Sequence, residues 1–592
     1  MRTAETIVTV IRERGTRGLP LERVYRLLFN RELFLRAYAR LYPNKGALTA
    51  GSTSETVDRM SLAKIDRLID ALRHERYRWT PVRRVFIPKS NGKQRPLGIP
   101  TWSDKLLQEV IRSILEAYFE PQFSRFSHGF RPGRGCHTAL QHVQQAWTGT
   151  KWFIEGDIAQ YFDTIDHDVL MGILGQHIHD GRFLRLMREL LGAGYLENWK
   201  FNATLSGTPQ GGVLSPLLAN MYLHQFDQWV EHELLPAYTR GTRRQSYPRY
   251  QTLCGRIQKA RLTGNRERLK DLLKQRRKLP SLDPNDAHYR RLRYVRYADD
   301  FLLGFAGPKA EAEAIKQRIK EWLRDTLKLK LSDEKTLITH AQDKARFLGY
   351  EITCTYSEDK LSADGRRSLH GQVALRVPLD VLRAKCARYR QNGVIQPRLD
   401  LLRNDDFTIV AKFQQEYRGI VQYYLYAHNV AWFHTLHYVM RSSLLKTLAS
   451  KHHTSVAKIA KRLSTTTETS EGKTLKCLAV RVERKGKRPL IAQFGGISLT
   501  RKPEAILNDC PQPIWDGHTE LIQRLLADEC ELCGARANIE VHHIRKLADL
   551  NRPGRKDKPA WVKRMATRQR KTLVVCRACH DAIHAGRQPK TP

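Results

Sequence analysis

The chain has 592 residues, 41% of them hydrophobic, so it is too long for one core and too apolar for a disordered chain, and three to five domains are expected. The chain has 102 Lys and Arg and 60 Asp and Glu, which gives a net charge of +42. A basic surface can serve solubility alone, but an excess this large favours a nucleic acid as the partner. The basic and acidic N-terminus resembles no signal peptide, and no apolar run is long enough to cross a membrane.

The first 80 residues are predicted to be helical, with an amphipathic stretch over 20–42 and a Gly/Ser/Thr loop over 47–56. Residues 81–100 predict a β-hairpin, because two short apolar runs, each ending in Pro, flank a turn that contains Asn and Gly. A long amphipathic helix is expected from about Ser103 to Phe119.

Carboxylates interrupt two apolar stretches. Residues 152–158 predict a buried strand that contains Asp157, and residues 294–305 predict a hairpin with Asp299 and Asp300 between its strands. An Asp–Asp pair alone is usually a surface turn or a cap, but burying two carboxylates among apolar neighbours is costly without a cation. Phosphoryl transfer to a 3′ hydroxyl uses two divalent ions held by hard oxygen ligands, so these three carboxylates are candidate ligands for two Mg²⁺ ions.

Two regions rich in basic residues lie before and after the hairpin predicted at 294–305. Residues 240–293 hold 17 Lys or Arg against 4 Asp or Glu, and part of the region, 256–278, can form a basic helix. A solvated loop is one interpretation, but the position directly before the Asp pair favours contact with nucleic acid. A helix follows over 308–327, and 405–465 predicts helices in which aromatic and basic side chains alternate, where core packing is favoured over base stacking.

Seven segments in sequence order resemble reverse transcriptases encoded by group II introns. They are RVFIPKSNGKQRPLGIPTWSDKLLQ (84–108), FSHGFRPGRGCHTAL (126–140), EGDIAQYFDTIDH (155–167), SGTPQGGVLSPLLANMYLHQFD (206–227), RYADDFLLG (296–304), LSDEKTLITH (331–340) and FLGYEI (347–352). The resemblance implies a multidomain α+β fold, a right-hand polymerase with fingers and palm and a helical thumb.

The resemblance also implies roles for single residues. Asp157, Asp299 and Asp300 correspond to the metal-binding triad, with the carbonyl of Ile158 as a further ligand. The remaining positions would surround the incoming nucleotide: Lys93 and Arg95 in the fingers, Phe162 as the steric gate against a 2′ hydroxyl, Gln210 and Gly211 beneath the nucleotide, and Lys335 near the primer. Basic side chains suit a triphosphate, which stays negative after it binds metal.

The resemblance divides the chain into five parts. They are an N-terminal helical extension of the fingers (1–80), fingers and palm with a basic insertion (81–365), a helical thumb or maturase domain (366–470), a DNA-binding region with a linker (471–525) and a small C-terminal domain (526–592). The stretches EYRGIVQYYLYAHN and SSLLKTLASKHHTSVAKI resemble the maturase domain, which implies binding of intron RNA.

The C-terminal part contains two Cys-x-x-Cys motifs, whose four thiolates predict a closed tetrahedral zinc site: Cys530, Cys533, Cys576 and Cys579. Two turns with free thiols are the alternative interpretation. Zinc is favoured because so small a module could hardly form enough core to fold without a metal. The other six cysteines are scattered singly, which suits a reducing cytosol.

Histidines near these motifs resemble an HNH (ββα-metal) endonuclease. The resemblance implies that His543 activates water while His542, His580 and His584 face a divalent cation, although the two neighbours at 542 and 543 could exchange roles. Lys571 stands where the family has its central Asn, so either another residue orients the base or nicking is impaired. Residues 545–590 hold 14 Lys or Arg against 3 Asp or Glu, which fits contact with DNA. The alternative to an active nuclease is a DNA-binding module that zinc stabilises and that does not cleave DNA.

Together these features predict a multifunctional protein of intron mobility. It would bind its intron RNA, assist splicing, nick one strand of target DNA and copy RNA from the new 3′ end with dNTPs. It would act in the cytoplasm of a bacterium or in an organelle, at the nucleoid. The alternatives are an RNA-binding splicing factor with dormant catalysis, which the intact Asp triad opposes, and a reverse transcriptase of a defence or diversification system.

Overall fold

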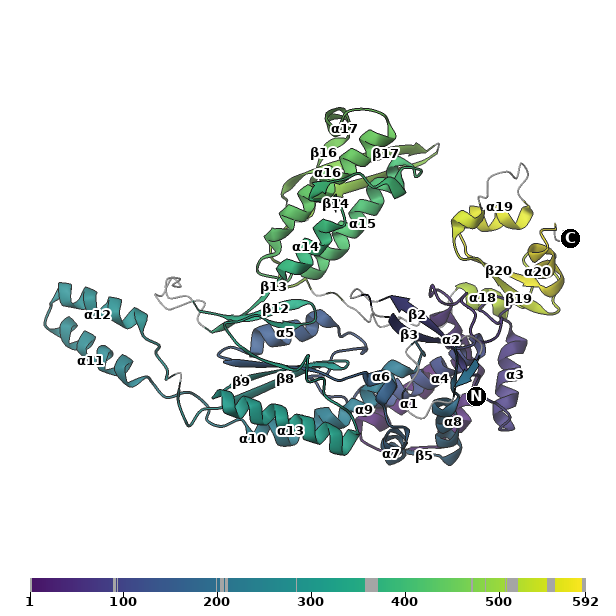
Figure 1. Cartoon of the computed structure of the whole chain (residues 1–592). Helices are drawn as coiled ribbons and strands as arrows, with labels where there is room; N and C mark the ends of the chain where they lie inside the picture. Colours follow the sequence, from purple (N-terminus) through teal and green to yellow (C-terminus); the bar gives the residue numbers. More distant parts are fainter. Residues whose placement is uncertain are drawn as a thin grey trace.

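The computed structural model describes residues 3–88, 92, 94–197, 200–202, 207, 211–283, 285–356, 371–469, 472–484, 486–505, 507, 520–550 and 559–587. In Figure 1, a central body of sheets and helices lies below a bundle formed by α14 to α17, and the C-terminal unit lies beside the N-terminal helices. No helix in these described ranges is long and apolar enough to span a membrane.

The N-terminal region is a helical layer packed on one long helix. Its helices are α1 (Ala4–Thr16), α2 (Arg31–Leu41), α3 (Leu62–Arg73) and α4 (Trp102–Phe119), and the last agrees with the helix predicted from Ser103. The prediction of a continuous amphipathic helix over 20–42 is wrong. A short strand β1 (Leu21–Glu22) pairs with β5 (Ile178–His179), and a 3₁₀ turn (Val24–Phe29) follows before Asn30 caps the N-terminus of α2.

The predicted hairpin at 81–100 is confirmed as β2 (Val82–Pro88) and β3 (Gln94–Ile99). These strands extend into a four-stranded sheet in the order β3-β2-β6-β7. The other two strands are β6 (Tyr195–Glu197), which pairs with β2, and β7 (Lys200–Asn202) at the edge. Helices α7 (His167–His177) and α8 (Gly181–Gly192) follow the central strand β4 and pack beside the N-terminal layer.

The central sheet has the antiparallel order β10-β4-β9-β8. Its strands are β4 (Trp152–Asp157), β8 (Arg291–Tyr297), β9 (Asp300–Ala306) and β10 (Leu337–His340), which confirms the predicted strand and hairpin. Neighbouring residues alternate between two cores, because side chains along a strand point to opposite faces. Ile154 and Leu303 pack with α9 (Ser215–Trp229) and α13 (Lys309–Leu327), whereas Phe153 and Leu302 pack with α5 (Cys136–Ala146).

The basic region after α9 forms a helical hairpin that extends away from the body (Figure 1). The single basic helix predicted over 256–278 is wrong: α11 (Pro248–Leu262) and α12 (Arg266–Lys278) are separated by a turn at Gly264, whose φ of +66° favours glycine. The two helices share a small core of their own around Leu253, Ile257 and Leu272.

A second body follows the central sheet. Strands β11 (Ala345–Phe347), β12 (Tyr350–Thr355) and β13 (Gln372–Arg376) connect it to the sheet, and its helices are α14 (Leu379–Ala387), α15 (Asp406–Tyr424), α16 (Phe433–Lys451) and α17 (Val456–Leu463). The helices predicted over 405–465 are thus confirmed. A three-stranded sheet of β16 (Ser464–Glu468), β17 (Thr474–Arg484) and β18 (Lys487–Gly495) packs on α15 and shares the same core.

The C-terminal unit is small. It consists of α18 (Glu520–Leu526), the hairpin β19 (Ile539–His543) and β20 (Thr572–Cys576), and helices α19 (Ala560–Thr567) and α20 (Arg577–His584). Its core is continuous with that of the N-terminal region, where α18 contacts α2 and Met60 pairs with Val541 of β19. The N-terminal and C-terminal parts of the chain therefore pack together.

Candidate metal centres

The structure brings Asp157, Asp299 and Asp300 together. Asp157 at the end of β4 is the cross-strand neighbour of Asp300 at the start of β9. Asp299 occupies the turn that joins β8 to β9, directly after Ala298, whose φ of +54° is unusual for a residue other than glycine. The tight turn therefore presents two carboxylates beside the third.

The electrostatics of the three carboxylates fit a site for cations. Burial, followed by repulsion from the neighbouring carboxylates, raises the pKa of Asp300 to about 7, and burial also raises the pKa of Asp299. The Nζ atom of Lys335 lies 2.9 Å from Oδ2 of Asp157 and supplies part of the missing positive charge. Carboxylates on neighbouring residues of paired strands, placed there at a cost in ionisation, are donors that suit Mg²⁺.

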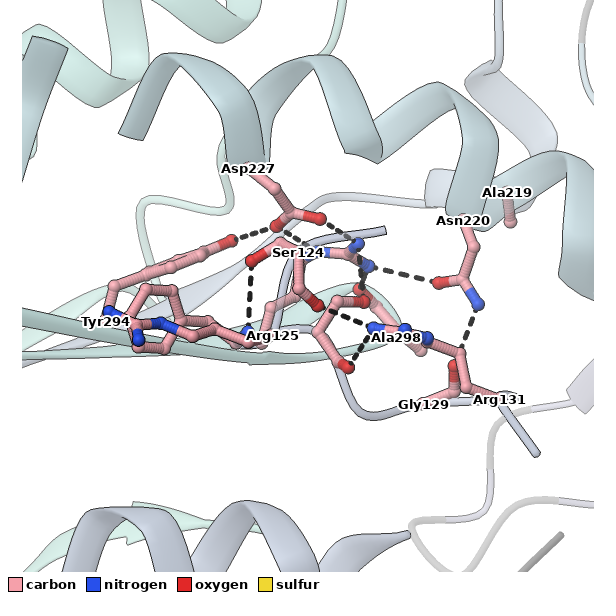
Figure 2. Close-up of polar contacts among 12 residues, drawn as sticks. Ser124, Arg125, Gly129, Arg131, Ala219, Asn220, Asp227, Tyr294 and Ala298 are labelled. Carbon is pink, nitrogen blue, oxygen red and sulfur yellow. Dashed lines mark hydrogen bonds and ion pairs between the residues drawn. The ribbon is translucent and has the colours of Figure 1, made fainter. Parts of the chain in front are cut away.

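An ion pair made by Asp227, with both side chains buried, holds the backbone of the turn in place (Figure 2 labels Asp227). The guanidinium of Arg296 is fully buried and donates to the carbonyl oxygen of Ala298 at 2.8 Å. The same group forms two hydrogen bonds to Asp227 of α9, at 2.5 and 2.8 Å, and Asp227 is also fully buried. The conformation before the Asp pair is thus tied to a helix about 70 residues earlier in the sequence.

Further hydrogen bonds complete this network (Figure 2). Tyr294 donates its hydroxyl to Asp227 at 2.7 Å, and Asn220 donates to the carbonyl oxygen of Gly129 at 2.8 Å. A Cβ atom on Gly129 would lie 2.4 Å from the backbone nitrogen of Ala298, so only glycine fits there. The network escaped the sequence analysis, although a charged residue in the apolar run before the Asp pair was a usable signal.

The other residues expected around a nucleotide are placed as follows. Arg95 is exposed on β3, and its positive charge opposes the rise in the pKa of Asp299. Ile158 is buried directly after Asp157. Phe162 is half-buried in the short helix α6 (Tyr161–Thr164), against the ring of Tyr161. Gly211 has a φ of +108°, and a Cβ there would lie 2.6 Å from Leu97 of β3. Lys93 and Gln210 lie outside the described residues.

The four cysteines of the C-terminal unit also converge. Cys530, Cys533, Cys576 and Cys579 lie with their sulfur atoms within 4.8 Å of one another. The Sγ atoms of Cys533 and Cys576 are 3.7 Å apart, close to the edge of about 3.8 Å that a tetrahedron with Zn–S bonds of about 2.3 Å has. The donor set and its spacing fit a structural zinc ion.

The neighbouring histidines of β19 face opposite ways. His542 points to the two histidines of α20, with Nδ1 of His542 at 3.1 Å from Nε2 of His580, and Nε2 of His584 at 3.2 Å from the same nitrogen. A residue that sequence analysis missed, Asp58, reaches this histidine cluster from the N-terminal region. Burial opposes ionisation of Asp58, but hydrogen bonds with His542 and His580 outweigh it and hold the pKa of this carboxyl far below its ordinary value.

His543 turns to the other side and is buried. Its Nε2 atom lies 2.9 Å from the hydroxyl of Tyr38 of α2, and its ring also packs near Tyr42. Burial lowers the pKa of His543 to about 3, so the imidazole is neutral at physiological pH. Lys571 is exposed directly before β20 and contributes its backbone carbonyl to Ile544.

Comparison with protein families gives three matches along the chain. Residues 87–352 match "Reverse transcriptase (RNA-dependent DNA polymerase)", residues 381–498 match "Type II intron maturase", and residues 530–580 match "AI2M/AI1M-like, HNH endonuclease". The first match contains the three carboxylates, and the last contains the four cysteines and three of the four histidines.

Similar proteins cover nearly the whole chain. The "Group II intron-encoded protein LtrA" of Lactococcus lactis subsp. cremoris is 39% identical over 587 residues, 95% of each chain. The "Uncharacterized 91 kDa protein in cob intron" of Schizosaccharomyces pombe is 32% identical over 95% of this chain and 69% of its own. The "Putative COX1/OXI3 intron 1 protein" of Saccharomyces cerevisiae is 31% identical over 94% and 68%, respectively.

Proposed function

Because the chain belongs to the group II intron-encoded proteins, with a reverse transcriptase domain, a maturase domain and an HNH endonuclease domain, we propose that it copies RNA into DNA at Asp157, Asp299 and Asp300. The observation that carries this proposal is the convergence of the three carboxylates from β4 and the β8–β9 turn, where burial and repulsion from neighbouring carboxylates oppose the ionisation of Asp299 and Asp300. Such a cluster is stable in its charged form when cations neutralise it.

The surrounding side chains have roles in this proposal. When bound, two Mg²⁺ ions would activate the 3′ hydroxyl of the primer and stabilise the departing pyrophosphate. Arg95, and Lys93 outside the described residues, would bind the triphosphate from the fingers, and Lys335 would hold the primer terminus near Asp157. Phe162 would exclude a 2′ hydroxyl, and Gly211 and Gln210 would line the nucleotide site, with the carbonyl of Ile158 as a further metal ligand.

The test of the polymerase is primer extension on an RNA template with Asp299→Ala as the matched variant. The wild-type chain is expected to extend the primer and the variant to lose extension while it keeps its fold, as judged by circular dichroism. Absence of synthesis by the wild-type chain would leave the splicing-factor alternative, with dormant catalysis, as the better account.

The nuclease proposal rests on the C-terminal unit. His542, His580 and His584 would hold a divalent cation, the four cysteines would hold a structural zinc ion, and neutral His543 would take a proton from the attacking water. His543→Ala is expected to abolish nicking of target DNA and to leave primer extension intact. Loss of both activities would point to a folding defect instead, and the zinc-stapled DNA-binding module would gain support if wild-type protein did not nick.

The maturase domain implies binding of intron RNA, and we propose that the chain works in a ribonucleoprotein which uses the nicked target strand as primer. In this layout, the central sheet would be the palm, the β2–β3 sheet with the N-terminal layer the fingers, and the α14–α17 bundle the thumb. The protein would act at the nucleoid of a bacterium or an organelle. Sequencing of the RNA that copurifies with the chain tests this, since RNA from outside an intron would favour a defence or diversification system.

A further inference from the structure

A short N-terminal segment, residues 57–60, runs along the edge of the HNH hairpin. The backbone nitrogen of Arg59 donates to the carbonyl oxygen of Val541 at 3.1 Å, and Val541 donates to that of Met60 at 2.8 Å. Val57 and Met60 are buried, at 1% and 0% exposure, so the segment is packed in place. It is a turn that forms a single antiparallel bridge, Met60 to Val541, with β19, which is the strand that carries His542.

This segment brings the carboxylate of Asp58 into the histidine cluster. Oδ2 of Asp58 lies 2.9 Å from Nε2 of His584, and Oδ1 lies 3.3 Å from Nε2 of His580 and 3.5 Å from Nδ1 of His542. Oδ1 also accepts a hydrogen bond from the backbone nitrogen of His543 at 2.8 Å, which fixes the orientation of the carboxylate. The four side chains each offer one donor atom within 4.8 Å of the others.

His580 is oriented as metal-binding histidines are. The other ring nitrogen of His580, Nδ1, lies 3.0 Å from Oε2 of Glu540, and His580 is fully buried. A carboxylate only accepts hydrogen bonds, so Nδ1 carries the proton and Nε2 directs its lone pair into the cluster. This carboxylate–histidine arrangement is the outer-sphere support typical of metal-binding histidines.

We propose that Asp58 is the fourth protein ligand of the divalent cation at the HNH histidines, so that the N-terminal region completes the nuclease site. The inference rests on the proposed nuclease function. Three imidazole nitrogens and one carboxylate oxygen suit a first-row divalent ion such as Mn²⁺. Cation binding then strengthens the packing of residues 57–60 on β19, because the ion joins two parts of the chain 484 residues apart.

A plainer role for Asp58 is to dock the two parts without binding an ion. The adjacent Arg59 points to the control, because its ion pair with Asp581 lies at the same interface and supplies none of the four donor atoms. Its guanidinium lies 2.6 Å from Oδ1 of Asp581 and 3.6 Å from Oε2 of Glu540, outside the set of four donor atoms. Asp581→Asn thus removes a carboxylate contact at the same interface, on the residue next to His580, without removing a proposed ligand.

The experiment is a Mn²⁺ titration of the full chain, with free Mn²⁺ measured by electron paramagnetic resonance. All proteins carry Asp299→Asn and Asp300→Asn, which remove the polymerase site, and retain zinc at the cysteines. In this background, Asp58→Asn is expected to weaken binding at the histidine site by about tenfold or more, since even loss of an outer-sphere partner costs about 10- to 100-fold. Asp581→Asn is expected to bind as the parent does, and Asp58→His to recover part of the lost affinity.

Two results would overturn the proposal. Equal affinity of Asp58→Asn and the parent would make Asp58 a docking residue, and equal losses for Asp58→Asn and Asp581→Asn would assign the effect to docking alone. His580→Ala separates these results from failure of the nuclease proposal itself. If His580→Ala also bound Mn²⁺ like the parent, the histidines would hold no cation, whereas loss of binding only in His580→Ala would leave the histidine site standing and remove Asp58 from it.

Discussion

At the scale of single residues, Asp300 shows the cost of placing carboxylates side by side. Its pKa is about 7, because burial and the charges of Asp299 and Asp157 oppose its ionisation. The folded state therefore binds a proton that the unfolded chain releases near pH 4. In the absence of Mg²⁺, the free energy of unfolding therefore falls as pH rises from about 4 to about 7, and this decrease is complete above pH 7.

Asp300→Asn is accordingly expected to raise the melting temperature without added magnesium at pH 8 while it abolishes primer extension. A gain of about 1–3 kcal/mol is expected, below the full value of a shift of this size because the group retains some solvent contact. Thermal melts at pH 8 and pH 4.5 check it, since the gain should vanish at the lower pH. The exposed Asp343→Asn is the control, and equal melting of Asp300→Asn and wild type at pH 8 would contradict the argument.

The ion pair of Arg296 and Asp227 should affect stability and primer extension for different reasons, and two variants can separate the two effects. Asp227→Asn leaves the buried guanidinium without its anion, and a loss of about 3–5 kcal/mol is expected in urea unfolding of the polymerase region. Replacing both residues, as Arg296→Met with Asp227→Leu, should recover much of that stability, because apolar side chains of similar size avoid a buried charge.

The double variant should nevertheless extend primers poorly. It lacks the hydrogen bond from Arg296 to the carbonyl oxygen of Ala298, which holds the turn that presents Asp299 and Asp300. Single-turnover primer extension measures this, with Asp227→Asn alone and wild type as references. Wild-type extension by a stably folded double variant would mean that the turn keeps its shape without Arg296.

At the scale of elements, the α11–α12 hairpin is a separable unit. It has its own core, and its two ends lie side by side, since the backbone nitrogen of Tyr247 donates to Ser281 at 3.1 Å and that of Asp283 to Gln245 at 2.8 Å. Residues 248–278 hold 11 Lys or Arg against 2 Asp or Glu. We therefore expect the hairpin to add little to the stability of the body and to add positive charge for nucleic-acid binding.

Replacing residues 248–278 by two glycines is expected to leave the melting temperature within a few degrees of wild type and to weaken RNA binding. The dependence of the binding constant on salt should become less steep, by about 0.7 to 0.9 in logarithmic slope for each phosphate that the protein no longer neutralises. Filter binding over a salt series measures this. A second variant that keeps the helices and changes their exposed Lys and Arg to Gln should show the same weakening; normal binding by that variant would assign the effect to shape.

At the scale of the whole molecule, we expect the C-terminal unit to depend on two different supports. Zinc at the four cysteines would replace the core that so small a unit lacks, and the contact of α18, β19 and residues 57–60 with the N-terminal region adds shared apolar packing. The polymerase carboxylates lie in a separate part of the chain, on the central sheet. The two activities should therefore respond differently to loss of zinc.

Ejection of zinc by a mercurial thiol reagent is expected to release one ion per chain and to abolish nicking, with primer extension largely retained. Hydrogen exchange should increase along β19 and β20 and in residues 57–60, because the unit unfolds away from that segment. Cys533→Ser should reproduce these effects, and Cys254→Ser, a cysteine on α11, should not. Loss of primer extension together with nicking would mean that the polymerase fold also needs the zinc unit.

The sequence alone determined the features that depend on local order. Apolar runs on both sides of the Asp pair predict the β8–β9 hairpin, turn residues predict β2–β3, and the two Cys-x-x-Cys motifs predict a metal site, because each signal lies within a few neighbouring residues. The amphipathic stretch at 20–42 misled because a capping Asn and pairing of β1 with β5 override helical periodicity, and the break at Gly264 was masked by the basic composition around it.

Only the tertiary structure decided which distant residues support these sites. The partner of Arg296 lies 69 residues earlier on α9, Tyr38 reaches His543 from α2, and Asp58 enters the histidine cluster from the opposite end of the chain. No periodicity or spacing encodes such pairs, because they arise when elements with complementary apolar faces pack and bring their polar side chains within a few ångströms. The sequence thus specified the reactive groups, and packing determined what holds them.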